Sequence, residues 1–116
     1  MANTTFNEKR ACPRFPVSIP ITIQDSSRNQ KISAHTCDIS TKGLCLLVDM
    51  AIPEGIHLDL SLQMLDDKND ITKKGKVVWS SKLESGKYRI GISLEDQKLE
   101  AIPIVLRTIM SRRISY

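Results

Sequence analysis

Two polar clusters, separated by a β-rich stretch, carry the side chains of this sequence that are best suited to binding a ligand. In the first, Arg10 and Arg14 stand four residues apart, and Pro13 and Pro16 keep their segment out of a helix. Each guanidinium offers a planar fork of donors that matches phosphate oxygens and the O6/N7 edge of guanine. Lys9 adds a point charge beside them. A lone arginine is usually a solvated charge, but two together suit an anionic ligand that bears guanine.

The second cluster holds Asp38, Ser40 and Gly43 at spacings of two and three residues. A carboxylate can accept hydrogen bonds from the N1–H and N2–H₂ edge of guanine, and a hydroxyl can donate to a phosphate or base acceptor. Asp and Ser followed by Gly are also ordinary turn chemistry, in which Gly43 supplies a positive φ. Both interpretations stay open for this cluster alone. Ser40 has only His35 nearby in sequence and no nucleophile elbow around it, so we expect no enzymatic activity.

Composition places the chain among ordinary globular domains. Its 116 residues suffice for one core, and 41% are hydrophobic and 26% charged. The net charge of +4 suits an anionic partner, but the cations are too dispersed for long-range attraction of nucleic acid. No run approaches the roughly 20 apolar residues of a membrane span, and residues 1–9 lack the apolar region of a secretory signal. We therefore expect a cytoplasmic protein without membrane insertion.

The cysteines predict neither disulfides nor a metal centre. Cys12, Cys37 and Cys45 are odd in number and show no CxxC spacing, so reduced thiols are expected. Cys45, between two leucines, is expected in the core. His35 and His57 are too few and too scattered to form a metal site with these thiols. We expect no metal and no cofactor.

Alternation of apolar and polar residues dominates the sequence from residue 17 to residue 95 and predicts half-buried strands. Pro20 marks the first of them as an edge or bulged strand, because proline cannot donate to a ladder. In such strands Trp79 and Tyr88 are expected to be buried in the core rather than to stack on a base. Six or so short strands with frequent turns predict a mainly β fold, a closed or nearly closed antiparallel barrel. The expected strands span residues 17–24, 30–37, 44–48, 56–64, 74–80 and 88–94.

The end of the chain changes to a helical period. Apolar residues fall on one face of a helical segment over residues 97–113. We expect this face to pack on the barrel, with a partner-binding role as the alternative. Pro103 is tolerated in a first turn only, so the main helix should begin near Ile102. The face comprises Leu99, Ile102, Leu106, Ile109 and Met110.

The order of these motifs resembles that of PilZ domains. Residues 10–14 form an RxxxR motif, and residues 38–43 form a [D/N]xSxxG motif. Residues 75–79, Gly-Lys-Val-Val-Trp, resemble the family's G-x-V-V-W strand, and residues 88–92, Tyr-Arg-Ile-Gly-Ile, resemble its Y-x-x-G-I/V strand. A C-terminal helix follows, as in the family. The resemblance runs from about Arg10 to that helix, which is nearly the whole chain.

The resemblance implies a six-stranded antiparallel β-barrel of the split-barrel type that binds the bacterial second messenger cyclic di-GMP. The two arginines would hold guanine and phosphate groups, while the carboxylate and hydroxyl of the second motif would contact a guanine edge or fix the clamp. The glycine would permit the tight turn, and the basic residue before RxxxR is associated with the number of ligand molecules bound. The implied ligand-binding residues are Lys9, Arg10, Arg14, Asp38, Ser40 and Gly43.

These expectations combine into one hypothesis. A flexible tail over residues 1–9 would precede a single PilZ-like domain over residues 10–116, with a ligand-binding loop at 10–16, the barrel at 17–95 and the helical segment at 97–113. Cyclic di-GMP would order the loop and so signal to a downstream protein. The alternative is a PilZ-like adapter that works by protein contact without nucleotide. A binder of single-stranded nucleic acid is disfavoured, because aromatic residues are only 4% of the chain.

Overall fold

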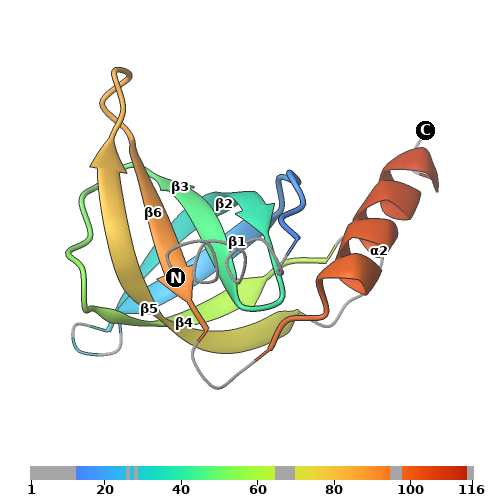
Figure 1. The fold of residues 1–116 in the computed structure, drawn as a ribbon, viewed down its shortest axis with the longest axis horizontal. Helices are drawn as coiled ribbons and strands as arrows, with labels where there is room; N and C mark the ends of the chain where they lie inside the picture. The colour runs from blue at the N-terminus through green and yellow to red at the C-terminus, as the bar shows by residue number, and fades with distance from the viewer. Residues whose placement is uncertain (1–12, 26, 28, 65–69, 95–97, 115–116) are drawn as a thin grey trace, which may run out of the picture.

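A computed structural model describes residues 13–25, 27, 29–64, 70–94 and 98–114. The tail 1–9, Arg10 and Cys12 lie outside the described residues. Within the described part of the chain, six antiparallel strands close into a barrel and one helix follows them (Figure 1). The elements are β1 Pro20–Asp25, β2 Gln30–Ile39, β3 Gly43–Val48, β4 His57–Leu62, β5 Ile71–Lys82, β6 Tyr88–Ser93 and α2 Ala101–Ile114.

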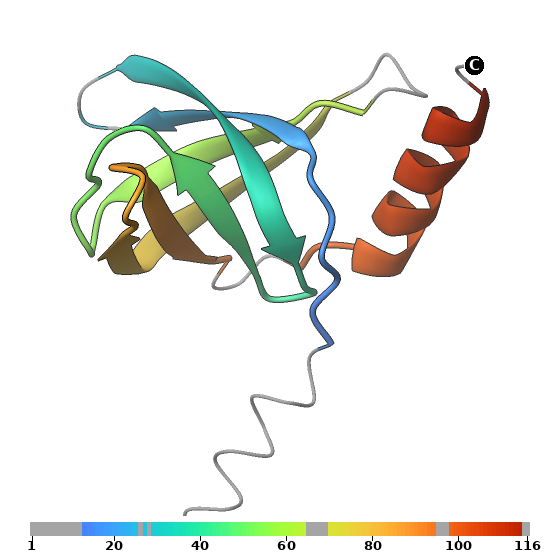
Figure 2. The same cartoon turned by 90° about the horizontal axis from the view of Figure 1, so that it is seen from above.

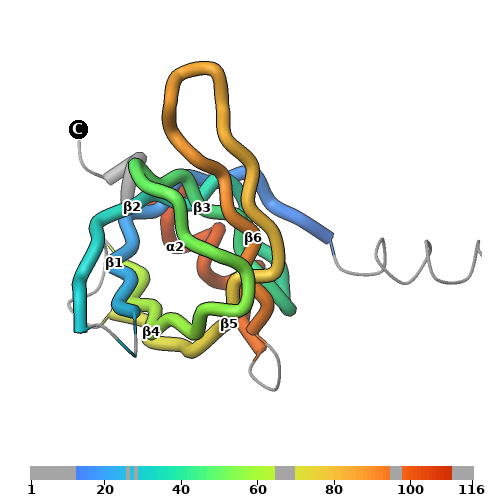
Figure 3. The backbone as a smooth tube through the Cα atoms, turned by 90° about the vertical axis from the view of Figure 1, so that its left-hand side faces the viewer, coloured from blue at the N-terminus to red at the C-terminus, as the bar shows by residue number. Residues whose placement is uncertain are grey.

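The strands follow the order β1-β2-β3-β6-β5-β4 around the barrel, and β1 closes the ring by pairing with β4 (Figure 3). The predicted mainly β fold with a closed antiparallel barrel is therefore confirmed. The expected edge or bulge at Pro20 is wrong: Pro20 pairs with His35 on β2, and the N–H of Gln63 donates to the Pro20 carbonyl at 2.9 Å on the other side. Proline is tolerated there because it is the first residue of β1.

The barrel interior is filled by aliphatic side chains from every strand. Strand alternation turns one residue in two inward, as the sequence pattern predicts. Burial of each large aliphatic side chain contributes about 1.5–3 kcal/mol to stability, so the core fixes the register of the ring. The fully buried side chains include Ile21, Ile23, Ile39, Leu46, Leu58, Leu60, Leu62 and Ile90.

Helix α2 stands at one end of the barrel and extends beyond it (Figures 1 and 2). Among the side chains described at residues 101–110 of the helix, those of Ala101, Ile104 and Thr108 are buried. The expectation that the face predicted from the sequence packs on the barrel is confirmed for Leu99, which is buried, and wrong for its other four residues. The helix is apolar on more than one side, and only the side with the short Ala101 approaches the core. The face left exposed is Ile102 (59%), Leu106 (54%), Ile109 (44%) and Met110 (58%).

The start of α2 agrees with the constraint that proline imposes. Pro103 occupies the first turn of a helix that begins at Ala101, where its missing N–H costs no intrahelical bond. Leu99 is buried just ahead of the helix. Across the described ranges, α2 included, no helix has the length and apolar character needed to cross a membrane.

Candidate functional site

The segment that carries Arg14 is fastened to strand β2. Phe15 and Ile39 exchange two backbone hydrogen bonds, of 2.8 and 3.0 Å. The buried Thr36 hydroxyl donates to the Val17 carbonyl at 2.5 Å and accepts from the Ile19 N–H at 2.9 Å. These bonds hold the chain after Arg14 antiparallel to the end of β2. Figure 2 shows the segment running beside that strand.

This pairing brings the two sequence motifs together. Nη1 of Arg14 lies 3.3 Å from Oδ1 of Asp38, across 24 residues of sequence. The two side chains are 60% and 27% exposed, so the ion pair contributes at most about 1 kcal/mol to folding. Both groups remain accessible to a ligand from solvent. Lys9 and Arg10, the other predicted basic contacts, lie outside the described residues.

Ser40 is placed at the same turn but faces inward. It is 5% exposed, and its N–H donates to the Gly43 carbonyl at 2.9 Å. Its hydroxyl also donates to the Gly43 carbonyl, at 3.1 Å, and accepts from the Gly43 N–H at 3.2 Å. The hydroxyl therefore closes the turn between β2 and β3, and this turn sets the position of the end of β2.

Gly43 is required for space rather than for backbone conformation. Among the described glycines, positive φ angles occur at Gly55 and Gly86, so the sequence-based interpretation of Gly43 as a positive-φ residue is wrong. A Cβ at Gly43 would lie 2.5 Å from the carbonyl oxygen of Ile92 on β6. Only glycine allows β3 to approach β6 this closely at the turn.

A β-bulge explains why Asp38 faces solvent. The β2–β3 register shifts between Thr36 and Asp38, so Cys37 and Asp38 together oppose Cys45. Thr36 and Ile39, on either side, are both buried. The extra residue lets both flanking side chains point inward while Cys37 and Asp38 remain on the outer surface. A regular strand would place only one residue on that surface at this point.

The same outer surface continues across β3, β6 and β5. Cys45 pairs with Gly91, and Gly91 pairs with Trp79. A Cβ at Gly91 would meet the Trp79 indole at Nε1, so the half-buried ring covers this glycine. Because Ile90 and Ile92 fill the interior, Gly91 and the indole lie on the outer side of the barrel.

Trp79 is therefore a candidate contact that sequence reasoning missed, and the expectation that it is buried in the core is wrong. Tyr88 comes nearer to the expectation, since it is partly buried and packs against the core. A glycine such as Gly91 leaves room for an aromatic ring from the neighbouring strand, and this signal could have placed Trp79 over it. The sequence does not show, however, that the register of β5 shifts between Val77 and Trp79. Simple alternation from Val77 therefore gives the wrong face for Trp79.

The turn also contacts the chain that leads into α2. The N–H of Leu94 donates to the Lys42 carbonyl and the N–H of Leu99 donates to the Thr41 carbonyl, each at 2.9 Å. Both acceptors lie between Ser40 and Gly43. The turn beside Asp38 and the start of α2, two residues after Leu99, are thus joined by two backbone hydrogen bonds.

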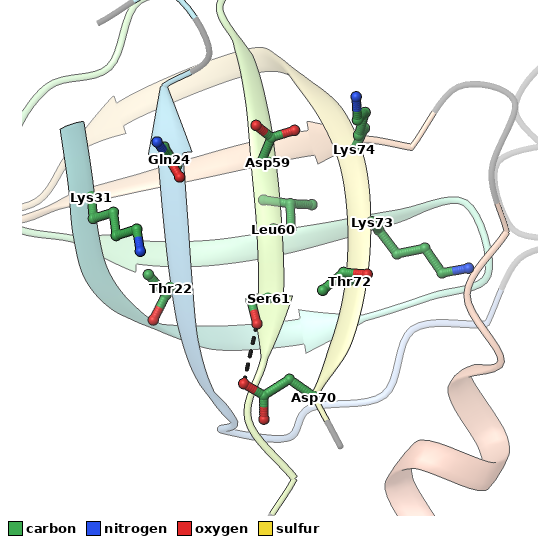
Figure 4. Close-up of a pocket in the computed structure, with 10 residues that line it drawn as sticks. All are labelled: Thr22, Gln24, Lys31, Asp59, Leu60, Ser61, Asp70, Thr72, Lys73 and Lys74. Atoms are coloured by element: carbon green, nitrogen blue, oxygen red, sulfur yellow. Dashed lines mark hydrogen bonds between the residues drawn. The ribbon is translucent and has the colours of Figure 1, made fainter. Parts of the chain in front are cut away.

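A hollow of about 690 Å³ lies elsewhere, on the outer face of β1 and β4 (Figure 4). In the strand order this face is opposite to β3 and β6. The hollow is lined by hydroxyls and by charges of both signs, including Lys31, Asp59 and Lys74. Ser61 donates to Asp70 at 3.3 Å within it. It contains neither Arg14 nor Asp38, and its open, self-paired surface does not match an anionic guanine ligand. In the described part of the chain, no three His, Cys, Asp or Glu residues are grouped so as to hold a metal ion.

Several solved structures share this fold. The Bacillus subtilis inhibitor of motility MotI/DgrA superposes with a TM-score of 0.64 at 13% identity over 90% of this chain, which spans 51% of MotI. The PilZ domain of YcgR from Escherichia coli, solved with c-di-GMP, gives 0.60 at 15% identity, with 90% and 88% of the two chains covered. The PilZ domain of CeSA from a cellulose-synthesizing bacterium gives 0.53 at 15% identity, with 90% and 99% covered.

Because the sequence identities are only 13–15%, these structural likenesses show the fold and nothing more. No curated protein sequence matches the chain. The family model described as PilZ domain matches residues 8–109, which include both motifs, all six described strands and most of α2. With its closed barrel and its two motifs joined at Arg14 and Asp38, this chain belongs to the PilZ domain family.

Proposed function

We propose that this protein is a bacterial, cytoplasmic receptor for cyclic di-GMP that has no enzymatic activity. The observation that carries the proposal is the 3.3 Å contact between Arg14 and Asp38, which joins the two halves of the motif pair on an accessible surface. Membership of the PilZ family supports the same ligand class. One structural neighbour, the YcgR PilZ domain, was solved with c-di-GMP.

The chemistry of each group defines its proposed role. The Asp38 carboxylate accepts from the N1–H and N2–H₂ groups of one guanine, and the Arg14 fork donates to phosphate oxygens or to O6 and N7. Lys9 and Arg10 supply the remaining positive charge from the N-terminal loop. Trp79 offers an aromatic ring on the same outer surface. Ser40 and Gly43 act indirectly, because their hydrogen bonds and close packing hold the turn.

The ligand-dependent signal is proposed to start in the loop before Pro13. New charge-assisted hydrogen bonds to the phosphates would order Lys9 and Arg10 over the barrel. The turn beside the site is bonded to the chain that enters α2 through the carbonyls of Thr41 and Lys42. A shift of the turn on binding therefore changes the position of α2.

The exposed apolar face of α2 is the proposed contact for the downstream protein. Ile102, Leu106, Ile109 and Met110 follow the i, i+4, i+7, i+8 spacing of a helix-packing face. Residues 101–114 also contain three arginines and no acidic residue. The partner surface that fits is an apolar groove or helix with an acidic rim.

Isothermal titration calorimetry with cyclic di-GMP tests the ligand. We expect saturable binding to the wild type, loss of binding in Arg14→Ala, and unchanged binding in Lys31→Ala, which removes an exposed cation from the hollow. Amide chemical shifts should move at Arg14, Asp38 and Ser40 during titration. If the wild type shows neither binding heat nor chemical-shift changes at high micromolar cyclic di-GMP, the receptor proposal is wrong and the alternative of a nucleotide-independent adapter is supported.

Hydrogen exchange tests the route to α2. The Leu94 and Leu99 amides, which donate to the turn, should change their exchange rates when cyclic di-GMP is added. Capture of a partner from lysate should depend on the ligand and should be lost in Leu106→Glu, which changes only an exposed residue. Unchanged exchange at both amides with bound ligand would contradict the proposed route.

A further inference from the structure

Two thiols lie on the outer side of the barrel wall beside Asp38. Cys37 and Cys45 are both free; Cys37 is half-buried and Cys45 is 3% exposed. They belong to neighbouring strands, and Cys37 lies close enough to Cys45 to raise the pKa of that thiol. The proposed receptor mechanism uses neither thiol.

The bulge in β2 accounts for this proximity. Because Cys37 and Asp38 together oppose Cys45, the extra residue places a second side chain over the same partner on the outer side. Asp38 is the direct partner of Cys45, and directly opposed residues of antiparallel strands have Cβ atoms about 4.5–5.5 Å apart. Cys37 is the neighbouring residue of the bulge, and a disulfide needs Cβ atoms about 3.5–4.5 Å apart. Because both thiols lie on the outer side of adjacent strands, a local movement of the bulge brings them to this geometry.

We propose that Cys37 and Cys45 form a reversible disulfide when the protein meets hydrogen peroxide. Peroxide oxidises the Cys37 thiolate to a sulfenic acid, and hydroxide leaves. The Cys45 thiolate then attacks the sulfenic sulfur, the S–S bond forms, and the S–O bond breaks to release water after proton uptake. The two thiols lose two electrons and two protons to one peroxide, which becomes two waters. A small dithiol reverses the reaction by thiol–disulfide exchange.

The two cysteines take different parts in this reaction because their surroundings differ. Cys37 is the more exposed thiol, so peroxide reaches it first. Cys45 lies between β2 and β6, and burial, followed by the nearby Cys37, raises its pKa to about 12. Asp38 on β2 also raises this pKa, whereas Arg89 on β6 lowers it.

The raised pKa sets the pH dependence. Since the attacking species is the Cys45 thiolate and burial raises the pKa of this thiol, ring closure should accelerate as the pH rises. The same reasoning makes Cys45 a poor first target, so oxidation begins at Cys37. The disulfide therefore forms faster in mildly alkaline than in neutral solution.

The site of the bond suggests a link with the ligand, and this step rests on the proposed function. Cys37 is adjacent in sequence to Asp38 and shares the outer side of the bulge with it. A cyclic di-GMP molecule on Asp38 covers Cys37 and slows its reaction with peroxide. Oxidation would then act mainly on the receptor without its ligand.

The test uses the full chain with Cys12→Ser, which leaves only the two thiols of interest. After treatment with dilute hydrogen peroxide, we expect intact-mass spectrometry to find the loss of two hydrogen masses, reversed by dithiothreitol. Peptide mapping should link the peptide containing Cys37 to that containing Cys45. Cys37→Ser and Cys45→Ser, each added to this background, should not lose the two hydrogens. Circular dichroism checks that both fold.

Other products would overturn the inference. A gain of oxygen masses without the two-hydrogen loss means that Cys37 oxidises without a resolving partner. A disulfide-linked dimer means that the thiols react between molecules. Neither readout uses a nucleotide, so failure here is distinct from failure of the receptor proposal. Slower oxidation in the presence of cyclic di-GMP supports the link with the ligand, and an unchanged rate at saturating ligand contradicts it.

Discussion

Residues of the Asp38–Gly43 motif have separate physical roles. Asp38 presents an accessible carboxylate to Arg14, whereas the Ser40 hydroxyl is bonded within the turn. Gly43 allows the backbones of β3 and β6 to approach each other. Loss of the carboxylate should therefore change ligand affinity with little effect on folding, while changes at the other two positions act through the shape of the turn.

Gly43→Ala tests the steric role of this glycine. Its Cβ would lie 2.5 Å from the carbonyl oxygen of Ile92, so the two strands must separate. We expect a loss of about 1–3 kcal/mol in the free energy of unfolding, as for an overpacked interior. Urea denaturation measures it, with Lys42→Ala, an exposed neighbour, as the control. A loss in Gly43→Ala no larger than in Lys42→Ala would contradict the steric argument.

At the scale of elements, strand β2 organises the site. Its bulge turns both Cys37 and Asp38 outward, and its end pairs with the segment that carries Arg14. Ahead of the bulge, Thr36 bonds to the same segment through its buried hydroxyl. The Arg14–Asp38 ion pair therefore depends on contacts between the bulged strand β2 and the chain segment that precedes β1.

Thr36→Val tests this attachment with a side chain of nearly the same shape. It leaves the Val17 carbonyl and the Ile19 N–H without their side-chain partner, and buried unsatisfied groups cost about 1–3 kcal/mol. We expect lower stability by that amount and faster proteolysis between residues 13 and 19. Thr72→Val, at an exposed position of β5, is the matched control. Equal stability of the two variants would show that the hydroxyl does not hold the segment.

At the scale of the whole molecule, the closed barrel separates the Arg14–Asp38 surface from the hollow over β1 and β4. The Arg14–Asp38 surface lies at the end of β2, and the hollow over β1 and β4 includes neither of these two residues. Helix α2 stands at one end, joined to the Ser40–Gly43 turn by backbone hydrogen bonds. The packed barrel core lies between the hollow and the proposed ligand surface, while the hydrogen-bonded turn connects the proposed ligand surface to α2.

Ligand binding should stabilise the whole barrel, because only the folded chain assembles the clamp. Cyclic di-GMP at about 100 times its dissociation constant is expected to raise the free energy of unfolding by about 2.7 kcal/mol. Urea denaturation with and without the nucleotide measures this gain. Arg14→Ala should match the wild type without ligand, since its ion pair is exposed, and should show no gain with it. Equal stabilisation of both proteins would place the ligand elsewhere.

The sequence predicted much of this fold because its signals are local. Alternation located the strand ends to within three residues, with the largest differences at the starts of β1 and β5, which lie at Pro20 and Ile71. It failed at Pro20, which pairs on both sides once the barrel closes, and at Trp79, where a register shift changes the face of the strand. The apolar face of the helix was found, but which side packs depends on the shape of the barrel end.

The sequence by itself determined the two motifs, the mainly β class and the absence of an obvious catalytic constellation around Ser40. Each of these follows from residue type and near-neighbour spacing, which the chain carries along its length. Only the tertiary structure decided that Arg14 meets Asp38, that Ser40 faces the turn, and that Cys37 lies close to Cys45. Such contacts depend on strand order, register and a bulge, and these are set by packing between segments far apart in the sequence.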